Sequence, residues 1–262
     1  MNRMPRFFYL GFLLIKLNIV SFLLLFFTAF LTGLVALLTS KWRERDFKMV
    51  LVFAGSYLFS ITILHILPEL FADKASAYSM GLYILIGFLL QQVLVFMSSG
   101  IEHGHIHQHS SHGMGNSVWT LMLGLVLHAF LEGTLLSKEP SLTGHHHGSE
   151  TLLMGIILHK IPESFALVAV LLTRVDKLKT FLLLVVFALA SPLGMLSTEM
   201  LYHQNIIGQE VINILFGLVA GGFLHISTMI FFESSPQHKF HFHKLLIILF
   251  AAGLAILSEY VI

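Results

Sequence analysis

The chain has 262 residues, of which 56% are hydrophobic and only 11% are charged. An ordinary soluble domain carries about 25% charged residues, so this chain lacks the polar groups needed to cover a water-facing surface, and lipid must be its solvent. A net charge of +1 argues against a nucleic-acid partner, and the absence of cysteine excludes disulfides and thiolate metal sites. The chain is predicted to be a single all-α membrane domain over residues 1–262, unusual in holding 16 histidines.

Eight apolar stretches are long enough to cross a membrane, which takes about 20 mostly apolar residues. Each is predicted to be helical, because lipid offers no hydrogen-bond partner to an open backbone. The first stretch follows Arg3 and Arg6 but lacks a small-residue cleavage site, so we interpret it as a retained helix rather than a signal peptide. The stretches are approximately 17–39, 48–70, 78–100, 117–137, 150–172, 180–203, 210–232 and 244–262.

Basic residues segregate between the two sides that these eight spans define. Loops that carry more Lys and Arg are usually cytoplasmic, so the odd-numbered loops are predicted inside and both termini outside. The same parity places the histidine-rich loop 101–116 in the cytoplasm. The predicted inner loops contain Lys41, Arg43, Arg45, Lys48, Arg174, Lys177, Lys179, Lys239 and Lys244, and the outer side has Arg3, Arg6, Lys16, Lys74 and Lys138.

Two apolar stretches each contain an ionisable pair with the spacing His-x-x-x-Glu. The pairs are His128 and Glu132 in 117–137, and His159 and Glu163 in 150–172. Residues four apart share one face of a helix, about 6 Å apart along its axis, and the two antiparallel spans place both pairs near mid-membrane. Ionisable residues at this depth are costly and usually functional, and two imidazoles with two carboxylates suit zinc. The alternative is an interhelical hydrogen-bond clamp.

These residues resemble the signature helices of the ZIP (Zrt/Irt-like) family of metal transporters. The resemblance lies in His128-x-x-x-Glu132-Gly133, in His159-x-x-Pro162-Glu163 and, more weakly, in the segment 191–194 (Ser-Pro-Leu-Gly). It implies eight helices with both ends outside, and a primary transport site formed by the two His/Glu pairs. It also implies inward metal transport by alternating access, and it suggests a homodimer.

By the same resemblance, a second metal site would use three further positions. Many family members hold a second ion with polar residues there, whereas this chain has Ala129, Lys160 and Ser191. Ala129 has no donor atom, and Lys160 brings a positive charge to the place of the second cation. We therefore predict a single-metal centre in which the Lys160 ammonium replaces the charge of the missing ion.

Two more His/Glu pairs lie near the predicted outer mouth. His65 and Glu69 end the second span, and Glu199 and His203 end the sixth. Both pairs could concentrate cations on an access route, with His65 the strongest candidate because it lies deepest and beside a proline. The alternative is that all four are interfacial polar residues at helix ends.

Three polar residues lie deeper in other spans. His225 in 210–232 could serve an exit route, or it could be a packing histidine bonded to a neighbouring helix. Gln91 and Gln92 in 78–100 are interpreted as structural hydrogen-bonding residues.

The loop 101–116 alternates histidine with small or polar residues, as flexible chelating tracts do. It could receive exported ions or sense cytoplasmic metal, but a disordered loop must be ordered to coordinate, so we expect weak binding that transport does not require. Its histidines are His103, His105, His107, His109 and His112.

Divalent metal transport is the function that these features favour, with zinc first. Imidazole and carboxylate also accept Fe²⁺, Mn²⁺, Cd²⁺ and Co²⁺, so the sequence does not set selectivity. The alternative is a membrane-embedded zinc hydrolase, but the His-Glu-x-x-His signature is absent and four protein ligands would leave zinc no open position. A proton-coupled carrier of an organic substrate would leave the histidine excess unexplained. Short loops favour a multi-pass protein of a bacterial cytoplasmic membrane.

Overall fold

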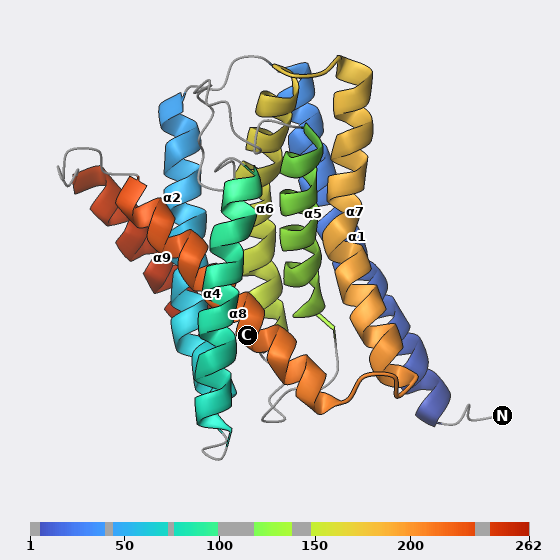
Figure 1. The fold of residues 1–262 in the computed structure, drawn as a ribbon. Helices are drawn as coiled ribbons and strands as arrows, with labels where there is room; N and C mark the ends of the chain where they lie inside the picture. The colour runs from blue at the N-terminus through green and yellow to red at the C-terminus, as the bar shows by residue number, and fades with distance from the viewer. Residues whose placement is uncertain are drawn as a thin grey trace.

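The computed structural model describes residues 6–39, 44–72, 76–98, 118–137, 148–233 and 242–261, and all regular structure among them is helical (Figure 1). The elements follow the predicted stretches in order, with a π-helical turn, η1, inside the second one. They are α1 (Arg6–Leu38), α2 (Glu44–Ile61), η1 (Thr62–Ile66), α3 (Leu67–Leu70), α4 (Ala77–Ser98), α5 (Val118–Thr134), α6 (Gly148–Leu171), α7 (Lys177–His203), α8 (Gln209–Glu233) and α9 (Phe242–Val261).

Six spans among the described residues are long and apolar enough to cross a membrane. Two shorter apolar helices, Val118–Thr134 and Phe242–Ser258, stand where the fourth and eighth spans are predicted. The described part of the chain is therefore all helical, and the chain is a multi-pass membrane protein. That all eight helices cross the bilayer stays a prediction.

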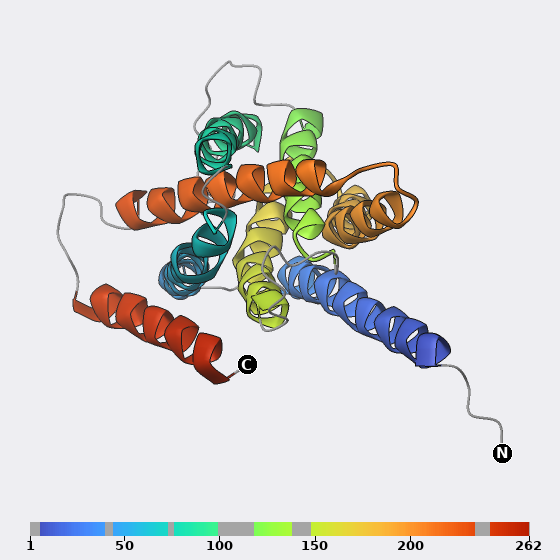
Figure 2. The same ribbon diagram turned by 90° about the horizontal axis from the view of Figure 1, so that it is seen from below.

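The antiparallel helices α5 and α6 occupy the centre of the bundle (Figures 1 and 2). On one side, α7 packs closely against α5, and α1 packs against both α6 and α7. On the other side, α4 packs against α5, while α8 runs obliquely across α2 and α4. At the edge, α9 packs against α2. The main packing partners of α5 are α7 and α4, and those of α6 are α1 and α2. Helices α5 and α6 contact each other mainly through long side chains.

Glycines permit the closest helix contacts. A Cβ atom at Gly133 of α5 would overlap the carbonyl group of Ser191 in α7, and one at Gly194 of α7 would overlap the carbonyl group of Phe130 in α5. Small residues let membrane helices approach to backbone contact in this way. The contact between Gly133 and Ser191 therefore fixes the position of α5 next to Glu132.

A proline produces the π-helical turn in the second span. Pro68 has no N–H group and its ring would clash with the carbonyl of Leu64 in a regular helix. The chain widens just before it, and the N–H of Leu67 donates to the carbonyl of Thr62 five residues back. His65 lies within this turn. By contrast, α6 stays helical through Pro162.

The termini of α7 are capped locally. Asp176 precedes the helix and accepts a hydrogen bond of 2.9 Å from the backbone N–H of Lys179, which lowers the pKa of its carboxyl group. At the other end, Asn205 adopts φ 55°, and the N–H of Ile206 donates to the carbonyl of Leu201 at 3.0 Å, as in a Schellman cap.

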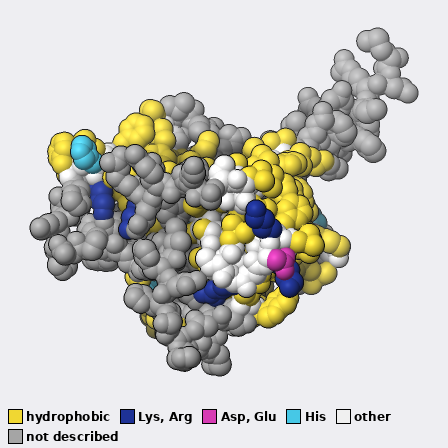
Figure 3. Space-filling view, turned by 90° about the horizontal axis from the view of Figure 1, so that it is seen from above, with side chains coloured by type: hydrophobic (Ala, Val, Ile, Leu, Met, Phe, Trp, Pro, Cys, Tyr) yellow, Lys and Arg dark blue, Asp and Glu magenta, His cyan; other side chains and the backbone are white. Residues whose placement is uncertain are grey.

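Described basic residues of the predicted inner loops gather at one end of the bundle. The ends of α1 and α6 and the beginnings of α2 and α7 all lie there (Figure 1), and these segments contain Lys48, Arg174, Lys177 and Lys179. Figure 3 looks onto this end and shows Lys and Arg side chains on it. The arrangement agrees with the predicted segregation of charge, while the placement of both termini outside stays a prediction.

Candidate metal centre

The two His/Glu pairs face each other in the protein interior. His128 and Glu132 on α5, and His159 and Glu163 on α6, are at most 3% exposed to solvent. Their (i, i+4) spacing places each pair on one face of its helix, and side-chain contacts between α5 and α6 join the two faces. The structure thus brings together the four residues that the sequence predicts.

The distances within this cluster suit a small cation. His128 Nε2 lies 3.1 Å from Glu132 Oε1 and 3.8 Å from Glu163 Oε1. His159 Nε2 lies 3.9 Å from Glu132 Oε1. Tetrahedral zinc with bonds of about 2.0–2.1 Å holds its ligand atoms roughly 3.3 Å apart, so a small inward movement would close the cluster around an ion.

Three of the four residues form the tighter group. Ligand atoms of His128, Glu132 and His159 all lie within 4.8 Å of one another, and no other set of His, Asp and Glu in the described parts of the chain forms such a group. Glu163 adjoins this group through its contact with His128. Glu132 is therefore the more central of the two carboxylates.

His159 has two buried ring nitrogens that a metal ion could satisfy. The side chain is fully buried, and neither of its ring nitrogens makes a hydrogen bond to any residue that the structure describes. A buried polar group without a partner is costly, and each such group in a native protein requires an explanation. A metal ion bound to the imidazole would supply the missing partner.

Lys160 binds both carboxylates from the side opposite to His128. Its Nζ lies 2.5 Å from Glu132 Oε2 and 2.7 Å from Glu163 Oε2. The ammonium also stands 5.1 Å from the centre of the Phe187 ring on α7. Each carboxylate therefore contacts Lys160 with its Oε2 atom and faces His128 with its Oε1 atom. Lys160 is only 1% exposed. Removing one partner of such a buried ion pair is strongly destabilising.

The other two positions assigned to a second metal are closed by packing. Ser191 on α7 donates a hydrogen bond of 2.8 Å to the carbonyl of Ala129 on α5. Both residues are buried. In this arrangement the Ser191 hydroxyl joins two helices.

Gln91 on α4 adjoins the cluster. From the sequence, this residue is interpreted only as a structural hydrogen-bonding residue. Its Oε1 lies 3.0 Å from His128 Nδ1. Gln91, His128 and Glu132 also line a cavity of about 10 Å³ where α4, α5 and α8 meet. The signal in the sequence is a polar amide within an otherwise apolar span, but the sequence does not show which residue it meets.

The remaining candidates lie apart from the centre. The distance between His65 Nε2 and Glu69 Oε2 is 3.8 Å, as is that between His203 Nε2 and Glu199 Oε1. The first pair is on η1 and α3 and the second on α7, on opposite sides of α5 and α6 (Figure 2). Their role on an access route stays a prediction.

His225 on α8 is buried and has contacts with α4. Its Nε2 lies 2.7 Å from Gln92 Oε1, and its ring stands edge-on to Phe88 with centres 4.8 Å apart. These are the contacts expected of a packing histidine, and an exit role stays a prediction. The loop histidines, His103, His105, His107, His109 and His112, lie outside the described residues.

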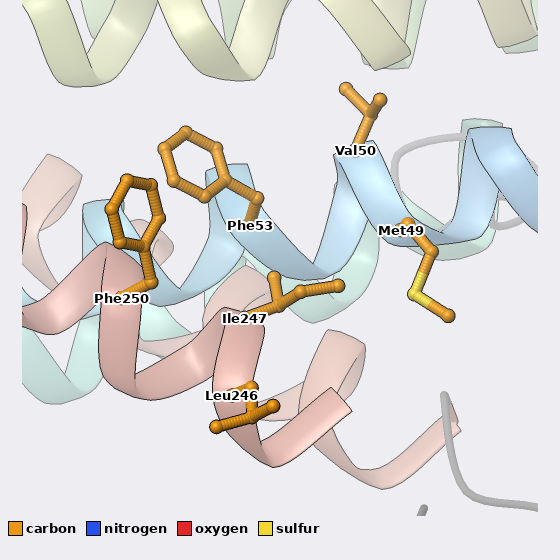
Figure 4. A pocket seen from close by; sticks show the side chains of 6 residues that line it. All are labelled: Met49, Val50, Phe53, Leu246, Ile247 and Phe250. Carbon is orange, nitrogen blue, oxygen red and sulfur yellow. The ribbon is translucent and has the colours of Figure 1, made fainter. Parts of the chain in front are cut away.

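A groove on the described surface lies between α2 and α9, away from the four proposed metal ligands. It has a volume of about 450 Å³ and is lined entirely by apolar side chains, which Figure 4 shows. Such a surface offers nothing to a hydrated cation. The lining residues are Met49, Val50, Phe53, Leu246, Ile247 and Phe250.

Comparison with known proteins adds an independent line of evidence. A family model described as ZIP Zinc transporter matches residues 97–259, which include the whole cluster. Zinc transporter ZIP9 of Xenopus tropicalis is 32% identical over 164 residues, covering 57% of this chain and 52% of the relative. Zinc transporter ZIP9 of Micropogonias undulatus is 33% identical over 163 residues, covering 56% and 51%.

A further relative is Protein zntD of Dictyostelium discoideum, which is 27% identical over 176 residues that cover 62% of this chain and 25% of the relative. The alignments thus span about half, or less, of the length of these relatives. The two ZIP9 relatives are named as transporters and not as hydrolases.

Proposed function

Because the chain belongs to the ZIP zinc transporter family, we propose that it carries divalent transition-metal ions, zinc foremost, across the membrane that its helices span. The observation that carries this proposal is the buried convergence of His128, Glu132 and His159, whose ligand atoms lie within 4.8 Å of one another. Nitrogen and oxygen ligands of this kind suit zinc, and a dication offsets the cost of burying carboxylates beside one another.

We propose that the site holds one ion, with Glu163 as the fourth ligand. The Oε1 atoms of both glutamates face His128, whereas their Oε2 atoms are taken by Lys160. A second ion would need the oxygens that bind this ammonium. The charge of Lys160 therefore replaces a second cation, and the geometry supports a mononuclear His₂Glu₂ centre.

The direction and setting of transport are also part of the proposal. Inward movement, alternating access and a homodimer follow from the family resemblance. A bacterial cytoplasmic membrane follows from the short loops, although the relatives named above come from eukaryotes. Fe²⁺, Mn²⁺, Cd²⁺ and Co²⁺ remain alternative substrates, because the same ligand types accept them all.

Zinc flux into proteoliposomes that contain the purified protein tests this function. His159→Ala and Glu163→Ala should each abolish flux, because each removes a ligand of the only ion. A chain lacking residues 103–112 should transport at the wild-type rate. The matched control is Glu210→Ala, since Glu210 is an exposed carboxylate at the start of α8.

Undiminished flux in both ligand variants would refute the proposed site. A wild-type protein that moves no zinc, iron, manganese, cadmium or cobalt would refute transport altogether. Peptide or ester hydrolysis that depends on added zinc and on Glu163 would favour the hydrolase alternative instead.

A further inference from the structure

Gln91 reaches the candidate metal centre from a helix that supplies none of the four proposed ligands. It is 3% exposed on α4, and its side-chain oxygen lies 3.0 Å from His128 Nδ1. The other ring nitrogen of the same imidazole, Nε2, faces Glu132 Oε1 at 3.1 Å and Glu163 Oε1 at 3.8 Å. One histidine thus joins an amide on one side to two carboxylates on the other.

The chemistry of a neutral imidazole determines what this contact does. The ring carries one proton, on either Nδ1 or Nε2, and the group that the other nitrogen meets selects the tautomer. An amide oxygen only accepts, so Nδ1 must carry the proton in order to donate to Gln91. Nε2 then presents a lone pair toward two carboxylate oxygens that also only accept. Such a convergence of acceptors is what a cation requires.

Without the amide, the opposite tautomer has the advantage. Nε2 would carry the proton and donate it to Glu132, which lies at hydrogen-bonding distance. An arriving metal ion would then have to displace that proton before it could bind. Partners of this kind, which contact the far nitrogen of a ligating histidine, typically change metal affinity or activity by about 10–100-fold.

We propose that Gln91 is a positioning residue for transport, which holds His128 in the tautomer that offers Nε2 to the metal. This inference rests on the proposed function of the same site. It assigns to α4 a direct influence on metal binding, although no ligand comes from that helix.

The neighbouring amide provides a matched control. Gln92 follows Gln91 on α4, but its Oε1 atom lies 2.7 Å from the Nε2 atom of His225 on α8. Its substitution disturbs the same helix and the same kind of bond without touching His128. We therefore compare Gln91→Met and Gln92→Met, which both keep the side-chain length and remove the hydrogen bond, with Gln91→Glu, which keeps an accepting oxygen.

Two measurements test the role. The first is the nitrogen-15 NMR spectrum of histidine-labelled, metal-free protein, in which the shifts of Nδ1 and Nε2 identify the tautomer and the His128 signals are assigned by their loss in His128→Gln. The second is the zinc concentration dependence of flux in proteoliposomes. Wild type, Gln92→Met and Gln91→Glu should show Nδ1–H at His128, whereas Gln91→Met should shift it to Nε2–H.

In the flux measurement, Gln91→Met should raise the KM for zinc about 10–100-fold while kcat changes less. Gln91→Glu and Gln92→Met should stay within a few-fold of wild type. An Nε2–H tautomer in wild type, an unchanged KM in Gln91→Met, or equal losses in Gln91→Met and Gln91→Glu would each overturn the role. These outcomes differ from failure of the proposed function, which would show as wild-type protein without zinc flux.

Discussion

The ammonium nitrogen of Lys160 on α6 lies 2.5 Å from the Oε2 atom of Glu132 on α5. The same nitrogen donates a hydrogen bond of 2.7 Å to Glu163 one turn further along α6. Lys160 therefore places one positive charge against two buried carboxylates. Since the ammonium contacts one oxygen of each carboxylate, the proposal that the centre holds a single ion rests on this contact.

Introducing oxygen ligands at the three second-site positions should change the number of metal ions bound. The combined variant Ala129→Asn, Lys160→Asp, Ser191→Glu supplies oxygen ligands at all three positions and removes the ammonium. We expect two zinc ions between α5 and α6 in this variant and one in the wild type, as seen by anomalous diffraction from zinc-loaded crystals. This measurement locates each ion, so zinc bound to loop histidines does not confuse the count.

Ala129→Asn alone is the control, and it should still hold one ion because Lys160 keeps its place. Two ions in the wild-type centre would contradict the role given to Lys160. So would a single ion in the combined variant, provided that it folds and still binds zinc between these helices.

The helices, and the placement of each His/Glu pair on one helix face, could be predicted from the sequence because both depend on local spacing. Long apolar runs define the helices, and the (i, i+4) spacing of His128 and Glu132 places both on one helix face. The contact between Gln91 and His128 joins residues 37 positions apart. It depends on the tilt and rotation of α4 against α5, which side-chain packing sets and a single sequence does not reveal.

The position of Lys160 shows the same limit. A lysine within a span usually pairs with another polar group, but only the packed structure shows that Lys160 binds both glutamates at once. The π-helical turn before Pro68 is a second example. Proline predicts a break in the helix, whereas the choice between a kink and a wider turn depends on the surrounding packing.

The two carboxylates of the centre should not contribute equally to zinc binding. Glu132 lies near both imidazoles, at 3.1 Å from His128 and 3.9 Å from His159, whereas Glu163 lies 3.8 Å from His128. We therefore expect Glu132→Gln to raise the KM for zinc flux at least about tenfold more than Glu163→Gln, a difference of about 1.4 kcal/mol in binding.

The amide in both variants keeps the size of the side chain, so the comparison isolates the loss of a charged ligand. Glu210→Gln, at an exposed position, serves as the control and should transport like the wild type. If Glu163→Gln raised the KM for zinc flux as much as Glu132→Gln, or more, Glu163 would be at least as central to the site as Glu132.

Close packing of α5 on α7 should be required for the metal centre. Gly194→Ala would place a methyl group against the carbonyl of Phe130, two residues from His128, so α5 must shift or the helices must separate. Overpacking of this kind costs about 1–3 kcal/mol and sometimes more. We expect a lower midpoint of thermal unfolding in detergent, together with reduced zinc flux.

Gly81→Ala on α4 is the matched control, because a Cβ atom there meets nothing within 4 Å among the described residues. That substitution should leave flux intact and, by removing a helix glycine, should add up to about 1 kcal/mol of stability. Equal unfolding midpoints and fluxes in the two variants would mean that the α5–α7 contact does not hold His128 and Glu132 in place.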